Sequence, residues 1–130
     1  MNQPRLVVLD DEPDLAEFIQ IVAERAGFAV EQFNDARLFK EQYNMPVDVI
    51  ILDIMMPGMD GLEVIRFLSS IESAAVLILT SGFDSDVLLS AQNLAEEHGL
   101  NVGGSLGKPF RYEQLYQLLS ELSITSQAST

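Results

Sequence analysis

The strongest constraint on the fold is an alternation between short apolar runs and longer segments with helical periodicity. Strand-like segments, three of them almost wholly apolar, lie at residues 6–9, 28–33, 47–52, 75–79 and 100–106. Each is followed by a segment in which apolar residues recur on one helix face, at 15–26, 35–43, 61–70, 86–97 and 112–122. Continuous apolar strands that alternate with amphipathic helices predict a parallel sheet covered by helices on both faces. We therefore expect an α/β domain built from five βα units.

These segments predict a single domain over residues 1–122. Gly27 and Gly99 follow two of the helices, as is common directly after a helix end. Residues 123–130, SITSQAST, are small and polar. We expect them to form a flexible C-terminal tail or the start of a linker.

The charge and residue usage exclude several classes of protein. Twenty acidic residues against seven basic ones give a formal charge of −13, which would repel nucleic acid phosphates and anionic lipid. We expect no direct nucleic acid binding and no membrane association. The absence of cysteine excludes disulfides and thiolate metal sites. Because we find neither a signal peptide nor an apolar run of roughly 20 residues, we expect a cytoplasmic protein.

Polar residues stand where four of the predicted strands end. In chain order they are Asp10, Asp11 and Glu12, then Asp53, then Thr80 and Ser81, then Lys108 and Pro109. Ligands of open α/β sheets bind outside the carboxyl ends of the strands, so we expect these side chains to converge at one edge. After Asp53 the loop would turn at Pro57 and Gly58, and Asp60 would start the next helix.

Carboxylates that converge at one edge of the sheet repel one another, and this repulsion has to be offset. Two of them about 4 Å apart repel by roughly 4 kcal/mol at an effective dielectric constant of 20. Protonation or a cation is therefore required. Lys108 offsets one charge, and a hard divalent ion with oxygen ligands, such as Mg²⁺, suits the rest. An aspartate beside such an ion, a lysine and a hydroxyl could be the nucleophile of a phosphoryl-transfer site.

Each of these residues also has a purely structural interpretation. Asp10 and Asp11 could cap the first helix, ahead of Pro13 in its first turn. Thr80 could be an ordinary strand residue, and Lys108 an ordinary loop residue. Their joint position at four strand ends favours a site.

The chain resembles the receiver domain of two-component response regulators in four motifs, which are Asp10-Asp11, Asp53 with the following MMPGMDG, Thr80, and Lys108-Pro109-Phe110. The resemblance covers about residues 5–122, and the motifs fall in the family's order. It implies a flavodoxin-like three-layer sandwich around a five-stranded parallel sheet of order 2-1-3-4-5.

The resemblance also implies a ligand and partners. Asp53 would accept a phosphoryl group from a sensor histidine kinase or a phosphotransfer protein. Asp11 would bind Mg²⁺ directly and Asp10 largely through water, with further ligands from Asp53 and the backbone carbonyl of Met55. Mn²⁺ can substitute for Mg²⁺ in this role.

The remaining motif residues have implied roles after phosphoryl transfer. Thr80 would hydrogen-bond the phosphoryl oxygen, Lys108 would pair with it, and the Lys108–Pro109 bond would be cis. The protein would then be a switch and not a metabolic enzyme. It would signal to an output domain or partner through the surface formed by residues 86–97, 100–106 and 112–122.

The sequence departs from the family at the switch. Ser105 stands where the family usually has Tyr or Phe, so we expect the coupling from Thr80 to be weaker or differently routed. Ser81 is larger than the alanine that is more usual there. Neither Met55 nor Gly82 offers an acid or base to activate water, so we expect slow self-dephosphorylation.

Two other functional classes are compatible with parts of the pattern. A phosphatase of the haloacid dehalogenase type also uses an aspartate nucleophile and Mg²⁺, but it has Asp-x-Asp after the strand, where this chain has Met55. An inert protein-binding module of the same fold is the other class. The intact set of Asp11, Asp53, Thr80 and Lys108 argues against it.

Overall fold

The computed structural model describes residues 3–43, 46–56, 61–82 and 85–128, and within these ranges five strands alternate with five helices. The strands are β1 (Arg5–Leu9), β2 (Ala29–Phe33), β3 (Val49–Asp53), β4 (Val76–Ser81) and β5 (Asn101–Gly107). The helices are α1 (Pro13–Arg25), α2 (Ala36–Gln42), α3 (Gly61–Ser70), α4 (Ser85–Glu97) and α5 (Tyr112–Ala128). The turn predicted at Pro57 and Gly58 and the helix-start role of Asp60 lie outside the described residues.

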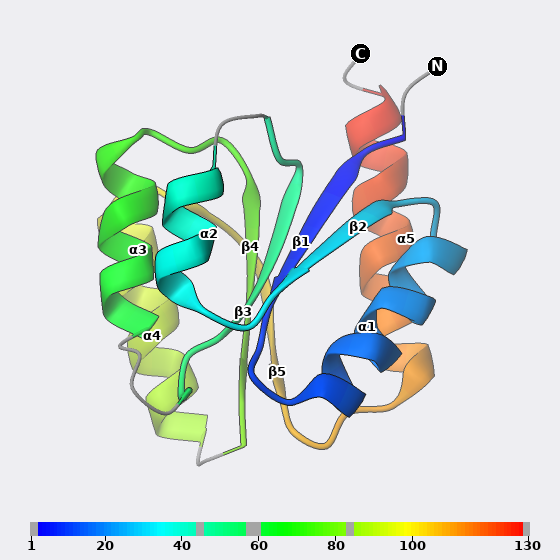
Figure 1. The fold of residues 1–130 in the computed structure, drawn as a ribbon, viewed down its shortest axis with the longest axis horizontal. Coiled ribbons are helices and arrows are strands. Elements are labelled where there is room, and N and C mark those ends of the chain that lie inside the picture. Colours follow the sequence, from blue (N-terminus) through cyan, green and yellow to red (C-terminus); the bar gives the residue numbers. More distant parts are fainter. Residues whose placement is uncertain (1–2, 44–45, 57–60, 83–84, 129–130) are drawn as a thin grey trace.

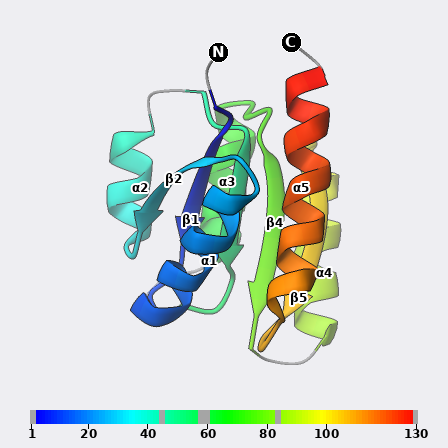
Figure 2. The same cartoon turned by 90° about the vertical axis from the view of Figure 1, so that its right-hand side faces the viewer.

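The strands form one parallel sheet of order β2-β1-β3-β4-β5, which confirms the predicted topology. Helices α1 and α5 cover one face, and α2, α3 and α4 cover the other (Figure 1). Figure 2 looks onto the face covered by α1 and α5, with the sheet behind these two helices. The fold is thus the predicted flavodoxin-like sandwich.

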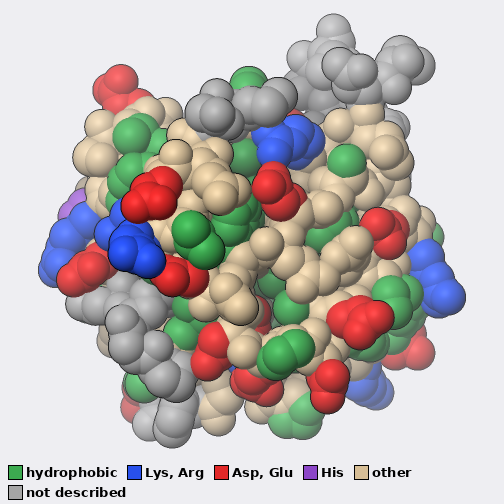
Figure 3. All heavy atoms as spheres, in the orientation of Figure 1, with side chains coloured by type: hydrophobic (Ala, Val, Ile, Leu, Met, Phe, Trp, Pro, Cys, Tyr) green, Lys and Arg blue, Asp and Glu red, His purple; other side chains and the backbone are tan. Residues whose placement is uncertain are grey.

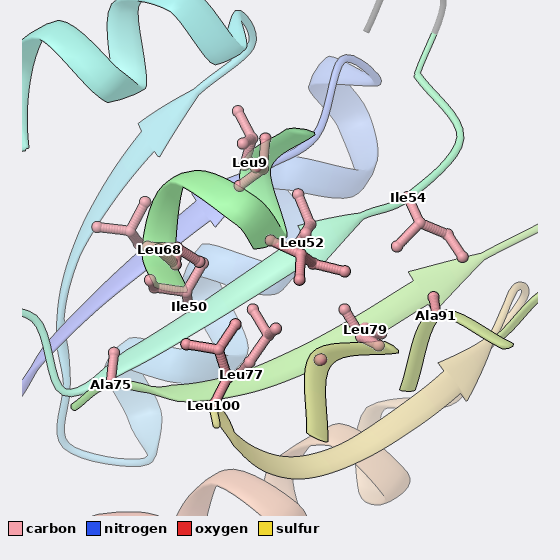
Figure 4. Packing of buried hydrophobic residues seen from close by; sticks show 14 of the residues in the cluster. Leu9, Ile50, Leu52, Ile54, Leu68, Ala75, Leu77, Leu79, Ala91 and Leu100 are labelled. Carbon is pink, nitrogen blue, oxygen red and sulfur yellow. The ribbon is translucent and has the colours of Figure 1, made fainter. Parts of the chain in front are cut away.

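The core explains why the central strands are apolar without interruption. All five residues of β3 are buried, because helices pack on both sides of it. Alternate residues serve opposite faces: Val49 and Ile51 join the cluster under α1 and α5, and Ile50 and Leu52 join the cluster under α2, α3 and α4. Figure 4 shows Leu52 among the side chains of the second cluster. This packing fixes the strand whose last residue is Asp53.

Helix boundaries agree with the predictions except at the C-terminus. Gly27 and Gly99 have φ angles of 102° and 82°, the left-handed conformation that ends helices at glycine. Helix α5 continues to Ala128, whereas the periodicity predicts an end at Leu122. Residues 123–128 contain neither glycine nor proline, so no backbone signal stops the helix there.

The structure also decides between two interpretations of the first acidic pair. The N-cap of α1 is Glu12, and no side chain makes a capping hydrogen bond there. Neither Asp10 nor Asp11 is therefore the cap. None of the helices in the described ranges is both long enough and apolar enough to cross a membrane.

Candidate functional site

The polar strand-end residues lie at one edge of the sheet. β1 and β3 are neighbours, so Asp10, directly after β1, lies beside the end of β3. Asp53 and Thr80 are register partners on the adjacent strands β3 and β4. Lys108 follows β5 directly, and its backbone N–H donates to the carbonyl oxygen of Ser81 at 2.8 Å. The topology therefore brings together residues from four strands.

Asp53 is only 2% exposed, and two hydrogen bonds fix the orientation of its buried carboxylate. Its Oδ1 accepts a hydrogen bond from the backbone N–H of Met55 at 3.0 Å. Its Oδ2 accepts one from Lys108 Nζ, also at 3.0 Å. Each oxygen thus has a donor, and the cost of burying the carboxylate is reduced.

Lys108 contacts three carboxylates at once. Its Nζ lies 3.0 Å from Asp53 Oδ2, 3.2 Å from Asp10 Oδ2 and 3.0 Å from Glu12 Oε1. Burial by itself would lower the pKa of Lys108, but the hydrogen bonds to Asp53 and Glu12 and the charge of Asp10 outweigh it and raise the pKa. Lys108 is therefore an ammonium at neutral pH. The Lys108–Pro109 bond is cis.

Asp10 is the least satisfied carboxylate of the group. Its Oδ1 accepts a hydrogen bond from the backbone N–H of Glu12 at 2.9 Å. Its Oδ2 is buried and, within the described part of the chain, has no partner in hydrogen-bonding geometry, although Lys108 is near. Burial raises the pKa of Asp10, and the Glu12 N–H and the charge of Lys108 offset this only in part. An ionised Asp10 is therefore only partly compensated.

The donor set fits a hard divalent cation. Carboxylate oxygens of Asp10, Asp11, Glu12 and Asp53 lie within 4.8 Å of one another. A single ammonium, that of Lys108, stands against these four carboxylates, and the buried Oδ2 of Asp10 is one oxygen that a cation would satisfy. Oxygen ligands of this kind suit Mg²⁺. The side chain of Met55 is 46% exposed and offers only a thioether, which a hard cation does not favour.

Thr80 is completely buried beside Asp53. Its carbonyl oxygen accepts a hydrogen bond from the Ile54 N–H at 3.1 Å, which ties the end of β4 to the loop after Asp53. Its Oγ1 has no hydrogen-bond partner among the described residues. A buried hydroxyl that has no partner among the described residues, next to the carboxylate of Asp53, is available to hydrogen-bond a group that binds there.

Glu12 is the site residue whose role the sequence did not predict. It stands at a strand end, but only the fold shows that its side chain reaches Lys108 from a position 96 residues earlier in the chain.

Ser105 is exposed on β5, paired in register with Leu79 and not with Thr80. Acidic side chains are visible over the lower part of the molecule, where the strands end (Figure 3).

The comparisons with known proteins agree with this geometry. The family model of the response regulator receiver domain matches residues 6–120. The chain belongs to this family. The resemblance inferred from the motifs is thereby confirmed, and the site lies where the receiver motifs meet.

Relatives of this receiver domain include a DNA-binding response regulator and a transcriptional regulatory protein. The DNA-binding response regulator MtrA of Mycolicibacterium smegmatis is 31% identical over 113 residues, which is 85% of this chain and 46% of that protein. The transcriptional regulatory protein YrkP of Bacillus subtilis is 30% identical over 86% of this chain and 46% of its own length. The chain thus spans about half the length of these relatives.

Solved structures show the same architecture. A response regulator from Colwellia psychrerythraea is 42% identical, with a TM-score of 0.85 over 95% of this chain and 99% of that one. The receiver domain of the Francisella response regulator 1452 is 25% identical, with a TM-score of 0.76 over 95% and 98% of the two chains. Both likenesses cover nearly the whole of this chain.

Proposed function

We propose that this receiver domain accepts a phosphoryl group on Asp53 in a Mg²⁺-dependent reaction. The observation that supports this most is the meeting of Lys108 Nζ with Asp53 Oδ2 at 3.0 Å, beside the carboxylates of Asp10 and Asp11. In the reaction, a carboxylate oxygen of Asp53 attacks the phosphorus of a phosphohistidine. The phosphorus–nitrogen bond breaks as the phosphorus–oxygen bond forms, and the imidazole leaves.

The residues around Asp53 would stabilise the phosphoryl group in two ways, by neutralising its charge and by hydrogen bonding to it. Asp10, Asp11, Asp53 and the backbone carbonyl of Met55 would hold Mg²⁺, which neutralises charge on the phosphoryl oxygens. Mn²⁺ would act in the same way. Lys108 would pair with the phosphoryl group, and the unpartnered hydroxyl of Thr80 would then donate to one of its oxygens.

The proposed output is a change at the surface formed by α4, β5 and α5. Thr80 would move toward the phosphoryl group, and this shifts an existing equilibrium at that surface. The phosphoryl donor would be a sensor histidine kinase or phosphotransfer protein, and the receiver of the signal an output domain or partner protein. The charge of −13 argues against DNA binding by this chain itself, and with cytoplasmic partners it would act in the cytoplasm.

The phosphorylated state is expected to be long-lived. Met55 is apolar and 46% exposed, and Gly82 has no side chain with which to orient a water molecule. The protein would therefore catalyse its own phosphorylation but only slow dephosphorylation. Decay of labelled protein after removal of the donor measures this, and a half-life of seconds would contradict it.

One incubation with Mg²⁺ and acetyl phosphate tests the function. Intact-mass measurement should show one phosphoryl group on the wild type, none on Asp53→Ala, and none on the wild type after EDTA treatment. Continuous release of phosphate without stable labelling would identify a phosphatase. No labelling of the wild type would identify an inert binding module.

A further inference from the structure

Glu12 has a contact in the site but no role in the proposed chemistry. Its Oε1 accepts a hydrogen bond from Lys108 Nζ at 3.0 Å, and 61% of its side chain is exposed. Its backbone N–H donates to Asp10 Oδ1, and Pro13 follows it as the first residue of α1. Although Glu12 is the N-cap of α1, its side chain does not cap the helix. The carboxylate is directed to Lys108 instead.

Before phosphorylation, the ammonium of Lys108 makes two side-chain hydrogen bonds, to Asp53 and Glu12, and forms a further ion pair with Asp10. An ammonium carries three N–H groups, and Asp53, Asp10 and Glu12 lie 3.0, 3.2 and 3.0 Å from Nζ. A phosphoryl group on Asp53 needs one of these donors. The phosphoryl group also brings about two negative charges into this cluster, so it competes with the carboxylates for Lys108.

Exposure decides which contact is released. Asp53 loses its carboxylate charge when it is phosphorylated, whereas the side chain of Asp10 stays charged and is only 2% exposed, so release of Asp10 would take a cation away from a buried charge. Glu12 would return to water, and exposed ion pairs contribute little to stability. Glu12 is therefore the partner that is lost most easily.

We propose that Glu12 is a positioning residue that holds the Lys108 ammonium in the unphosphorylated protein and is exchanged for a phosphoryl oxygen once Asp53 is phosphorylated. This inference rests on the proposed function of Asp53. In the exchange, one N–H of Lys108 leaves Glu12 and is accepted by the phosphoryl oxygen, and the Glu12 carboxylate becomes solvated. Because the contact is broken in this exchange, it opposes phosphorylation.

Three variants separate the contact from the charge of Glu12. Glu12→Gln removes the charge and weakens the contact. Glu12→Asp keeps the charge but withdraws the carboxylate by one methylene. Asp14→Asn is the control, because Asp14 is an exposed acid in the first turn of α1 and its loss changes the net charge equally.

The first measurement observes Lys108 directly in metal-free, unphosphorylated protein. The chain contains only two lysines, Lys40 and Lys108, so Lys40→Arg identifies the side-chain NMR signal of Lys108. We expect the Lys108 signal to shift in both Glu12 variants, because the hydrogen bond from Nζ to Glu12 is weakened or lost. The signal should stay close to that of the wild type in Asp14→Asn. This measurement does not depend on phosphorylation.

The second measurement is the rate of labelling by acetyl phosphate at saturating Mg²⁺. Both Glu12 variants should be labelled faster than Asp14→Asn, by a factor of about 1.5 to 5, which is what one exposed ion pair can contribute. Unchanged Lys108 signals in the Glu12 variants, or labelling no faster than in the control, would overturn the inference alone. Absence of labelling in the wild type would overturn the proposed function and the inference with it.

Discussion

At the scale of single residues, Lys108 governs the electrostatics of the site. Its ammonium lies within 3.2 Å of three carboxylates, two of them buried. The paired aspartates, Asp53 and Lys108 could all be identified from the sequence, because each follows a strand and strand ends converge in a parallel sheet. The reach of Glu12 and the unsatisfied oxygen of Asp10 could not, because they depend on side-chain directions that only the fold sets.

The raised pKa of Asp10 leads to a prediction about stability and pH. Ionising Asp10 costs more in the folded than in the unfolded protein, because its pKa is raised above the ordinary value of 3.8 by burial. The favourable contribution of Asp10 to the free energy of unfolding is therefore fully present below pH 3.8. It is lost as the pH rises through the pKa of Asp10 in the folded protein. Without metal, Asp10→Asn should be more stable than the wild type at neutral pH.

Urea unfolding in EDTA at several pH values measures this difference. The advantage of Asp10→Asn should shrink toward acidic pH and should not occur in the exposed control Asp14→Asn, where a carboxylate that favours the helix start is lost. Added Mg²⁺ should stabilise the wild type more than Asp10→Asn. A wild type that is more stable than Asp10→Asn in EDTA at neutral pH would contradict the account.

The unpaired hydroxyl of Thr80 leads to a prediction with opposite signs in two states. Thr80→Val keeps the shape but removes a buried hydroxyl that has no partner among the described residues, so the unphosphorylated protein should gain about 1 kcal/mol in unfolding free energy. With Mg²⁺ and beryllofluoride, a phosphoryl analogue, Thr80→Val should be stabilised less than the wild type. Thr80→Ser is the control, because it keeps the hydroxyl. Equal stabilisation of Thr80→Val and the wild type would exclude the proposed role of Thr80.

At the scale of elements, β5 departs most from the apolar strands beside it. Its residues include Gly103 and Gly104, and its pairing with β4 is irregular between Leu77 and Ile78. The weak apolar pattern predicted a strand here but did not explain why two glycines stand in it. Close packing around these glycines leaves little room for larger side chains. A Cβ on Gly103 would overlap Cγ1 of Val76, and a Cβ on Gly104 would lie 3.4 Å from Leu118 of α5.

This difference between neighbouring glycines can be tested. Gly103→Ala should lower the free energy of unfolding by roughly 1–3 kcal/mol, because Val76 is a stiff side chain and must move. Gly104→Ala should be nearly neutral, because its new methyl group meets Leu118 at an ordinary contact distance. Combining Gly103→Ala with Val76→Ala should recover part of the loss. Equal effects of the two single glycine substitutions in urea unfolding would contradict this packing.

At the scale of the whole molecule, the sequence predicted the class of fold, and the motif resemblance predicted the strand order. Uninterrupted apolar strands such as β3 are buried on both faces, and that requires a covered parallel sheet. The continuation of α5 to Ala128 was not predicted, because a polar segment without glycine or proline carries no apolar face from which to read a helix. Ser105 was identified as unusual, but its exposure and its pairing with Leu79 come from the structure.

The most direct test of the account is a crystal structure of the protein with Mg²⁺ and beryllofluoride. The account predicts beryllofluoride bonded to a carboxylate oxygen of Asp53, with Lys108 Nζ and Thr80 Oγ1 in contact with its fluorine atoms and Mg²⁺ held by Asp10, Asp11 and Asp53. An unmodified Asp53 under these conditions, or a Lys108 that points away from the bound analogue, would contradict it.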